Sequence, residues 1–236
     1  MIIMPSLIFK RVILLLSLIL IISEAYGQSR PDSFTFLFNR VQESENAIDT
    51  LNGSAYYFDG KLYLHVSYPV NQFFFVDDRK IKIYYPESKR GYDIISDAPF
   101  DLPIVNSLIA FMKDDYGLAK IGFIIRSNSV SGDTLIAHWE HMSGPDSGKF
   151  EIYYKDDIIV KARYSAKSIF LETVLKDHKT FGGYLIPTHI ETRNSSLRNS
   201  EIESLFVEQL SINPEIPDSI MNFDFPDDAV IEKRKF

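Results

Sequence analysis

Residues 61–85 read KLYLHVSYPVNQFFFVDDRKIKIYY, and apolar side chains occupy alternating positions near both ends of this stretch. Leu62, Leu64 and Val66 form one series, and the alternation resumes at Ile81. A period of two is typical of strands with one buried and one solvated face, which is the antiparallel pattern. The stretch therefore predicts antiparallel hairpins.

The same rhythm extends along most of the remaining chain, with turn sequences between the segments. Asp59-Gly60 precedes the quoted stretch, Pro86-Glu87-Ser88 follows it, and Gly182-Gly183 punctuates the second half. Residues of these types favour tight hairpin turns. Further strands are predicted at residues 121–126, 134–140, 150–154, 158–164, 169–175, 184–193 and 204–212. The polar residues 193–204 are interpreted as a long exposed hairpin loop.

Two segments have helical spacing instead. After Pro31-Asp32-Ser33, the residues Phe34, Leu37, Phe38 and Val41 recur at intervals of three and four, which predicts a helix over about 32–50. Asp101 before Leu102-Pro103 is a start signal for a second helix of about a dozen residues. The predicted fold class is α+β: a curved antiparallel β half-barrel with these helices covering the concave face, leaving an apolar hollow.

The first thirty residues have the features of a secretory signal peptide. Lys10 and Arg11 precede an apolar run at Val12–Ile22, and Ala25-Tyr26-Gly27 supplies small residues at both cleavage positions. An uncleaved anchor is the alternative, but the run is shorter than the ~20 residues needed to cross a bilayer. We expect a signal peptide over 1–27, cleavage near Gly27, export to the periplasm, and one domain over 28–236.

Composition excludes several classes of function. The chain has 236 residues, a formal net charge of -7 and no Cys. It has no basic surplus to neutralise phosphates, so nucleic acid is not an expected partner. The absence of Cys excludes thiol catalysis, thiolate metal sites and an acylated amino-terminal Cys.

No motif in the chain supports catalysis. His138-Trp139-Glu140-His141 brings two imidazoles and a carboxylate together, but on a strand positions 138 and 141 point to opposite faces. Nucleophile elbows, His-Glu-x-x-His and phosphate loops are missing from the sequence. We expect no enzymatic activity, no metal site and no cofactor. The basic residues between Lys149 and Lys167 are interpreted as a solvated sheet face, with an acidic partner as the alternative.

Motifs in the quoted stretch 61–85, in residues 183–187 and in residues 212–229 together resemble the family of LolA-like outer-membrane lipoprotein carriers. Tyr68-Pro69-Val70-Asn71-Gln72 leads into an apolar strand and an Asp-containing turn, and the next strand ends in Tyr84-Tyr85-Pro86. In the second half, Gly183-Tyr184-Leu185-Ile186-Pro187 is similar to the family's Gly-x-x-x-Pro strand start. Residues 212–229 are similar to its closing segment. The resemblance covers about residues 33–231.

This resemblance implies a soluble periplasmic carrier that holds acyl chains of lipoproteins, or of another lipid, in a hydrophobic half-barrel. It implies an inner-membrane release complex and an outer-membrane acceptor as partners, and we expect a monomer. The family's carriers have an arginine on the strand before the Pro and Gln, where this chain has Tyr63. Tyr63 is therefore the expected lid contact, as a hydrogen-bond donor without charge.

The expected cavity is made of apolar residues from strands and helices predicted to turn inward. The set comprises Phe38, Leu62, Leu64, Val66, Phe73, Phe75, Ile83, Leu108, Phe111 and Trp139. The alternative for each ring is ordinary core packing. If such packing fills the hollow, the domain would be an envelope interaction or sensory module of the same fold that binds a protein partner without shuttling lipid.

Overall fold

The computed structural model describes residues 31–45, 47–77, 79–97, 115–167, 169–196 and 200–235. Residues Asp32–Phe236 form one compact unit. The predicted signal peptide, and the predicted second helix with Leu108 and Phe111, lie outside the described residues. Within the described residues, no helix is both long and apolar enough to cross a membrane.

Fourteen strands form a single sheet. In chain order they are β1 (Ser33–Glu43), β2 (Ile48–Phe58), β3 (Lys61–Tyr68), β4 (Gln72–Asp77), β5 (Lys80–Tyr85), β6 (Arg90–Ile95), β7 (Phe123–Ser131), β8 (Thr134–His141), β9 (Lys149–Lys155), β10 (Ile158–Ala166), β11 (Ile169–Phe181), β12 (Tyr184–Ser196), β13 (Ser200–Ile212) and β14 (Val230–Lys235). The described helical segments are short: η1 (Ala119–Ile121), η2 (Pro145–Ser147) and α3 (Asp218–Met221).

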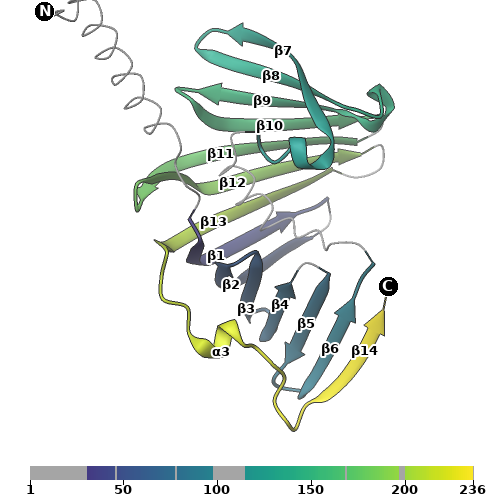
Figure 1. Ribbon diagram of the computed structural model, residues 1–236, viewed down its shortest axis with the longest axis vertical. Coiled ribbons are helices and arrows are strands. Elements are labelled where there is room, and N and C mark those ends of the chain that lie inside the picture. Colours follow the sequence, from purple (N-terminus) through teal and green to yellow (C-terminus); the bar gives the residue numbers. More distant parts are fainter. Residues whose placement is uncertain are drawn as a thin grey trace, which may run out of the picture. The chain divides into compact units, whose positions relative to one another are not determined.

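The sheet consists of two antiparallel meanders joined in the middle. One meander runs from β1 to β6 and the other from β7 to β13, and β1 pairs with β13 where they meet (Figure 1). The strand order is β14-β6-β5-β4-β3-β2-β1-β13-β12-β11-β10-β9-β8-β7, so the sheet stays open, with β14 and β7 as its edges. This arrangement confirms the predicted curved, open antiparallel sheet. The helices predicted to cover its concave face are not seen in the described residues.

The helix predicted over residues 32–50 is wrong, because β1 and the start of β2 occupy this segment. Phe34, Phe36 and Phe38 lie at every second position, and each is nearly completely buried. The spacing of Phe34, Leu37 and Phe38 fits a helix as well, but Leu37 is 38% exposed and lies on the other face. Aromatic residues at a period of two favour a strand when neighbouring strands are available to pair.

Two further differences concern the second half of the chain. The predicted loop at 193–204 is mostly strand, because β12 continues to Ser196 and β13 begins at Ser200. Near the start of β13, Glu203 forms an ion pair with Arg40 of β1, and cross-strand pairs of this kind stabilise a sheet. The carboxyl-terminal β14 was not predicted, and it pairs parallel with β6, unlike every other pair in the sheet.

The hairpin turns follow from residues that tolerate left-handed backbone. Asp59 and Gly60 between β2 and β3 have φ of 47° and 74°, and Gly182 and Gly183 between β11 and β12 have φ of 54° and 87°. Two consecutive positive φ values match a type I′ turn, whose twist suits antiparallel strands. These two predicted turns are confirmed, and they fix the register of their hairpins.

Candidate functional site

The two faces of the sheet differ in chemistry. We call the face that carries Phe34, Phe36 and Phe38 the core face, and the other face the reverse face. Pairing places Gly53 of β2 beside Phe38, and Val66 of β3 beside Gly53. A Cβ at Gly53 would lie 2.8 Å from Cζ of Phe38, so the missing side chain lets this ring lie over the neighbouring strand.

The core face is a continuous apolar surface that crosses both meanders. Its buried side chains belong to one cluster, which includes Phe34, Phe36, Phe38, Ala55, Leu62, Leu64, Val66, Val76, Ile152, Ala162, Leu175, Ile190, Leu205 and Val207. Leu118, just before η1, packs against the same cluster. Burial raises the pKa of nearby Tyr116, and a hydrogen bond with Thr173 partly offsets this rise. Much of the core face is therefore covered by the protein's own side chains.

At the β7 and β8 end of the sheet, the described part of the core face includes solvent-exposed apolar side chains. Ile125 and Val130 of β7 are 50% and 73% exposed, and Leu135 of β8 is 41% exposed. Pairing places Ile125 beside Trp139, and Val130 beside Leu135, on the core face. Exposed apolar residues that continue a buried apolar face are typical of a binding surface.

The predicted cavity residues divide between the two faces. On the core face lie Phe38, Leu62, Leu64, Val66, Ile83 and Trp139. Phe73 and Phe75 lie on the reverse face, because Phe74 is the residue that pairs with Leu64. Side chains alternate between the two faces of a strand. A cavity set that includes Phe73 and Phe75 therefore places every side chain of β4 on the wrong face. A lipid-binding role for any of these residues stays a prediction.

Tyr63, the expected lid contact, also lies on the reverse face. Its ring contacts those of Tyr56 and Phe223, with centroids 6.2 and 5.5 Å away. Burial, and to a lesser extent Tyr56, raises the pKa of the Tyr63 hydroxyl. Phe58, Phe75 and Ile220 of α3 form the centre of the same small cluster. Tyr63 therefore anchors the segment between β13 and β14, and its lid role stays a prediction that this orientation does not favour.

Sequence reasoning missed several members of the core face. The predicted helix over 32–50 includes Phe34 and Phe36, and the predicted cavity set omits Ile152, Ile190 and Leu205. The alternation of Phe34, Phe36 and Phe38 was the available signal for β1. For Ile152, Ile190 and Leu205, the strands were predicted, but only the pairing of β9, β12 and β13 shows that they share one face.

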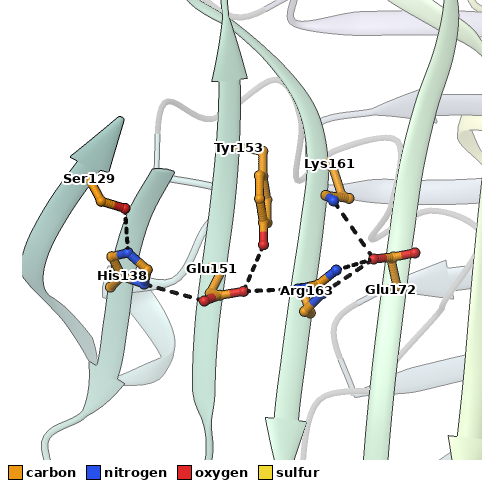
Figure 2. A network of polar contacts seen from close by, with 7 residues as sticks. All are labelled: Ser129, His138, Glu151, Tyr153, Lys161, Arg163 and Glu172. Atoms are coloured by element: carbon orange, nitrogen blue, oxygen red, sulfur yellow. Dashed lines mark hydrogen bonds and ion pairs between the residues drawn. The ribbon is translucent and has the colours of Figure 1, made fainter. Parts of the chain in front are cut away.

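On the reverse face, a row of polar contacts crosses β7 to β11. Figure 2 shows its members, Ser129, His138, Glu151, Tyr153, Lys161, Arg163 and Glu172. Arg163 lies 2.7 Å from Glu172 and 3.4 Å from Glu151, and Tyr153 donates to Glu151 at 2.8 Å. Burial, followed by the hydrogen bond to Glu151, raises the pKa of Tyr153 to about 12. The carboxylates of this row neutralise the positive charges of Arg163 and Lys161. The predicted basic stretch therefore carries little uncompensated positive charge at this place.

At one end of the row, a serine, a histidine and a carboxylate are in contact in the same sequence as in the catalytic triad of serine hydrolases. Oγ of Ser129 is 2.9 Å from Nε2 of His138, and Nδ1 of His138 is 3.4 Å from Glu151. Glu151 is shared with Arg163 and Tyr153, so its charge is already compensated. The row is better explained as a cross-strand stabilising network than as a catalytic site. His138 and His141 lie on opposite faces, as the strand period predicts.

Solved structures share this fold at low sequence identity. A LolA superfamily protein from Nitrosomonas europaea is 13% identical with a TM-score of 0.57, over 84% of this chain and 93% of its own. A DUF1329 family protein from Desulfovibrio piger is 13% identical with a TM-score of 0.56, over 88% and 95%. A Vibrio parahaemolyticus domain assigned to outer membrane lipoprotein sorting is 10% identical with a TM-score of 0.56, over 86% and 94%.

These likenesses confirm the LolA-like resemblance at the level of the fold. No protein-family model matches the sequence, and a search of curated proteins finds no significant relative. Because a fold hosts many functions, function has to be argued from the chemistry of the two sheet faces.

Proposed function

We propose that the protein is a periplasmic carrier that binds acyl chains of lipoproteins, or of another lipid, on the core face for transfer to the outer membrane. The observation that carries this proposal is the apolar core face, which spans both meanders and stays exposed at Ile125, Val130 and Leu135. The fold it shares with a LolA superfamily protein and a lipoprotein-sorting domain supports the same function.

The proposed mechanism is non-covalent. Each methylene that moves from water to an apolar surface contributes about 0.8 kcal/mol to the free energy of binding. Burial of a whole acyl chain is therefore strongly favourable. An acyl chain would enter over the β7 and β8 end, where the core face is open. Transfer would need an inner-membrane release complex and an outer-membrane acceptor, which we propose as partners. The mechanism requires no cofactor, metal or catalytic group.

Adjacent residues of β8 provide a matched test. Leu135 lies on the core face, and its neighbour Ile136 lies on the reverse face, opposite Tyr153 of β9. Leu135→Asp places a carboxylate where the acyl chain should lie, and an acyl chain that covers this charge would remove it from water at a high cost in free energy. Ile136→Asp adds the same charge on the reverse face of the sheet. We expect at least tenfold weaker binding of a fluorescent fatty acid to Leu135→Asp and nearly unchanged binding to Ile136→Asp.

The wild-type protein should also carry cargo from its own envelope. Native mass spectrometry, followed by denaturing analysis, should release a lipoprotein or acyl lipid from it. A bare mass that acylated peptide does not change, or equal loss of fatty-acid binding in both Asp variants, would contradict the carrier proposal.

A second candidate is an interaction module of the same fold that binds an envelope protein. It is favoured by the dense packing of the core face, where Phe34 is 1% and Ile152 is 0% exposed. A core filled by its own side chains leaves less room for acyl chains. Absence of lipid binding by the wild-type protein would favour this second function.

A further inference from the structure

A separate hollow of about 420 Å³ lies on the reverse face, where β13, β1, β2 and β3 run side by side. Its volume is within the roughly 300–1,000 Å³ of small-molecule sites. The polar residues that line it are Asn39, Asn52, Ser54, His65, Ser67 and Glu208. Phe38 and Gly53, which belong to the core face, and Leu37 complete the lining. The polar residues all lie on the reverse face, so an acyl chain bound to the core face would leave them free.

Two of the residues that line the hollow are asparagines side by side on adjacent strands. Asn39 of β1 pairs with Asn52 of β2, and Oδ1 of each is buried without a hydrogen-bond partner. Buried amide oxygens normally accept a hydrogen bond, and Asn is depleted in strands. Two adjacent asparagines in the middle of the sheet, each with an unpaired Oδ1, depart from both tendencies. Such local violations without a structural gain are expected at functional sites.

The backbone is irregular on both sides of these asparagines. The pairing of β1 with β13 shifts register between Thr35 and Leu37, and Gln209 of β13 has a positive φ of 50°. The pairing of β2 with β3 shifts between Asn52 and Gly53. Bulges redirect side chains and are frequent next to binding sites. Here they adjoin two residues that line the hollow, Glu208 and Asn52.

One stacked ring, that of His65, lines the hollow beside the amides. On β3, His65 is bonded to Asn71 at 3.0 Å and stacks on Phe73 with a centroid distance of 4.4 Å. On β13, Phe206 pairs with Asn39 and stacks on His189, also at 4.4 Å, next to the residues that line the hollow but outside that lining. Each ring is therefore held in place by a partner within the protein. Preorganised groups of this kind lower the entropic cost of binding.

The lining chemistry identifies the class of ligand. None of the described residues that line the hollow is Lys or Arg, so a phosphate or carboxylate ligand would lack a compensating charge. The amides, hydroxyls and carboxylate form a set that mostly accepts hydrogen bonds but also donates them. Sugar hydroxyls both donate and accept, and sugar C–H faces pack against rings. We propose that the hollow binds a neutral carbohydrate of one or two sugar units.

The test uses the mature exported protein and a glycan array, followed by saturation-transfer NMR with the methyl glycosides of the sugars that bind. Asn52→Ala removes one unpartnered amide, and Ser54→Trp fills the hollow while leaving both amides in place. Asn128→Ala, at an exposed position on the distant edge strand β7, is the matched control. We expect tenfold or greater loss of sugar affinity in the first two variants and none in the control.

Asn52→Ala is expected to fold, since it removes a buried oxygen that has no hydrogen-bond partner. Ser54→Trp is expected to fold because the added ring has the hollow to occupy. Circular dichroism checks this for each variant. Absence of sugar binding by the wild-type protein, or binding that Ser54→Trp leaves unchanged, would overturn the proposal. Choline or spermidine serve as cationic probes. Binding of these alone, lost in Glu208→Gln, would assign the hollow to cations and also overturn it.

Discussion

Single charged residues on the reverse face carry interactions that the sequence does not reveal. Glu191 of β12 accepts hydrogen bonds from Lys176 at 2.6 Å and from Arg193 at 3.1 Å. Its side chain is 15% exposed. The bond from Lys176, with a smaller contribution from Arg193, lowers the pKa of Glu191, and burial opposes this effect. The protein should therefore be more stable when Glu191 is ionised.

We expect Glu191→Gln to remove a pH-dependent part of the stability. A carboxylate whose pKa is lowered by folding stabilises the native state above its unfolded pKa, near 4.5, and loses that effect as the pH falls through the folded pKa. The variant should be about 0.5–1 kcal/mol less stable than the wild type near neutral pH. This difference should shrink in acid.

Urea unfolding at neutral and acidic pH measures this difference. Glu215→Gln, at an exposed position after β13, is the control because it removes the same charge. A Glu191→Gln deficit that stays constant with pH would show that packing, not ionisation, explains its cost.

Among the elements, β1 is the strand on which the core depends. It pairs with β2 on one side and β13 on the other, so it joins the two meanders. Phe34, Phe36 and Phe38 all point to the core face, and the rings of Phe34 and Tyr57 stack 4.8 Å apart. Loss of one of these rings should affect both meanders, because no other strand pairing connects them in the described residues.

Adjacent substitutions in β1 test this interpretation. Phe36 is 2% exposed and Leu37 is 38% exposed, on opposite faces of one strand. We expect Phe36→Ala to lower the free energy of unfolding by about 3–5 kcal/mol, as for other buried phenylalanines. Leu37→Ala should cost clearly less, because part of that side chain is already in water. Denaturant unfolding compares them, and similar costs would contradict the assigned faces of β1.

At the scale of the whole molecule, a single sheet separates two surfaces that differ in chemistry. The core face is mainly apolar and contains the proposed acyl site, with the Arg40–Glu203 ion pair near one end, and the reverse face carries further charge pairs and the polar hollow. The backbone of β1 and β2 lies between Phe38 on one side and Asn39 and Asn52 on the other. Ligands on the two faces should therefore bind without competing.

We expect independent stabilisation by the two ligand classes. A ligand at 100 times its Kd stabilises the native state by about 2.7 kcal/mol. For a domain of this size, that raises the Tm by about 5–10 °C. Differential scanning fluorimetry with a fatty acid, with a sugar identified on the array, and with both should show additive gains in stability. A sugar that displaces the fatty acid would place both ligands on one surface.

The chain's alternating pattern was enough to predict an open antiparallel sheet, most of its strands and its tightest turns. Leu62, Leu64 and Val66 alternate clearly, and Asp59-Gly60 and Gly182-Gly183 are local signals. Such features depend on neighbouring residues only, so they can be read without a structure. The helix predicted over 32–50 is wrong because the apolar residues of this segment fit two periods, and pairing with β2 and with distant β13 selects the strand.

The proposed binding surfaces depend on tertiary structure in a stronger sense. Whether Phe73 or Phe74 joins Leu64 is set by the register of β4 on β3, since a shift of one residue exchanges the faces. Asn39 and Asn52 are 13 residues apart, and Glu208 approaches them only because β13 pairs with β1. The alternation in the sequence establishes that each strand has two faces. Long-range strand pairing establishes which residues share a face, because those contacts join segments that have no local influence on each other.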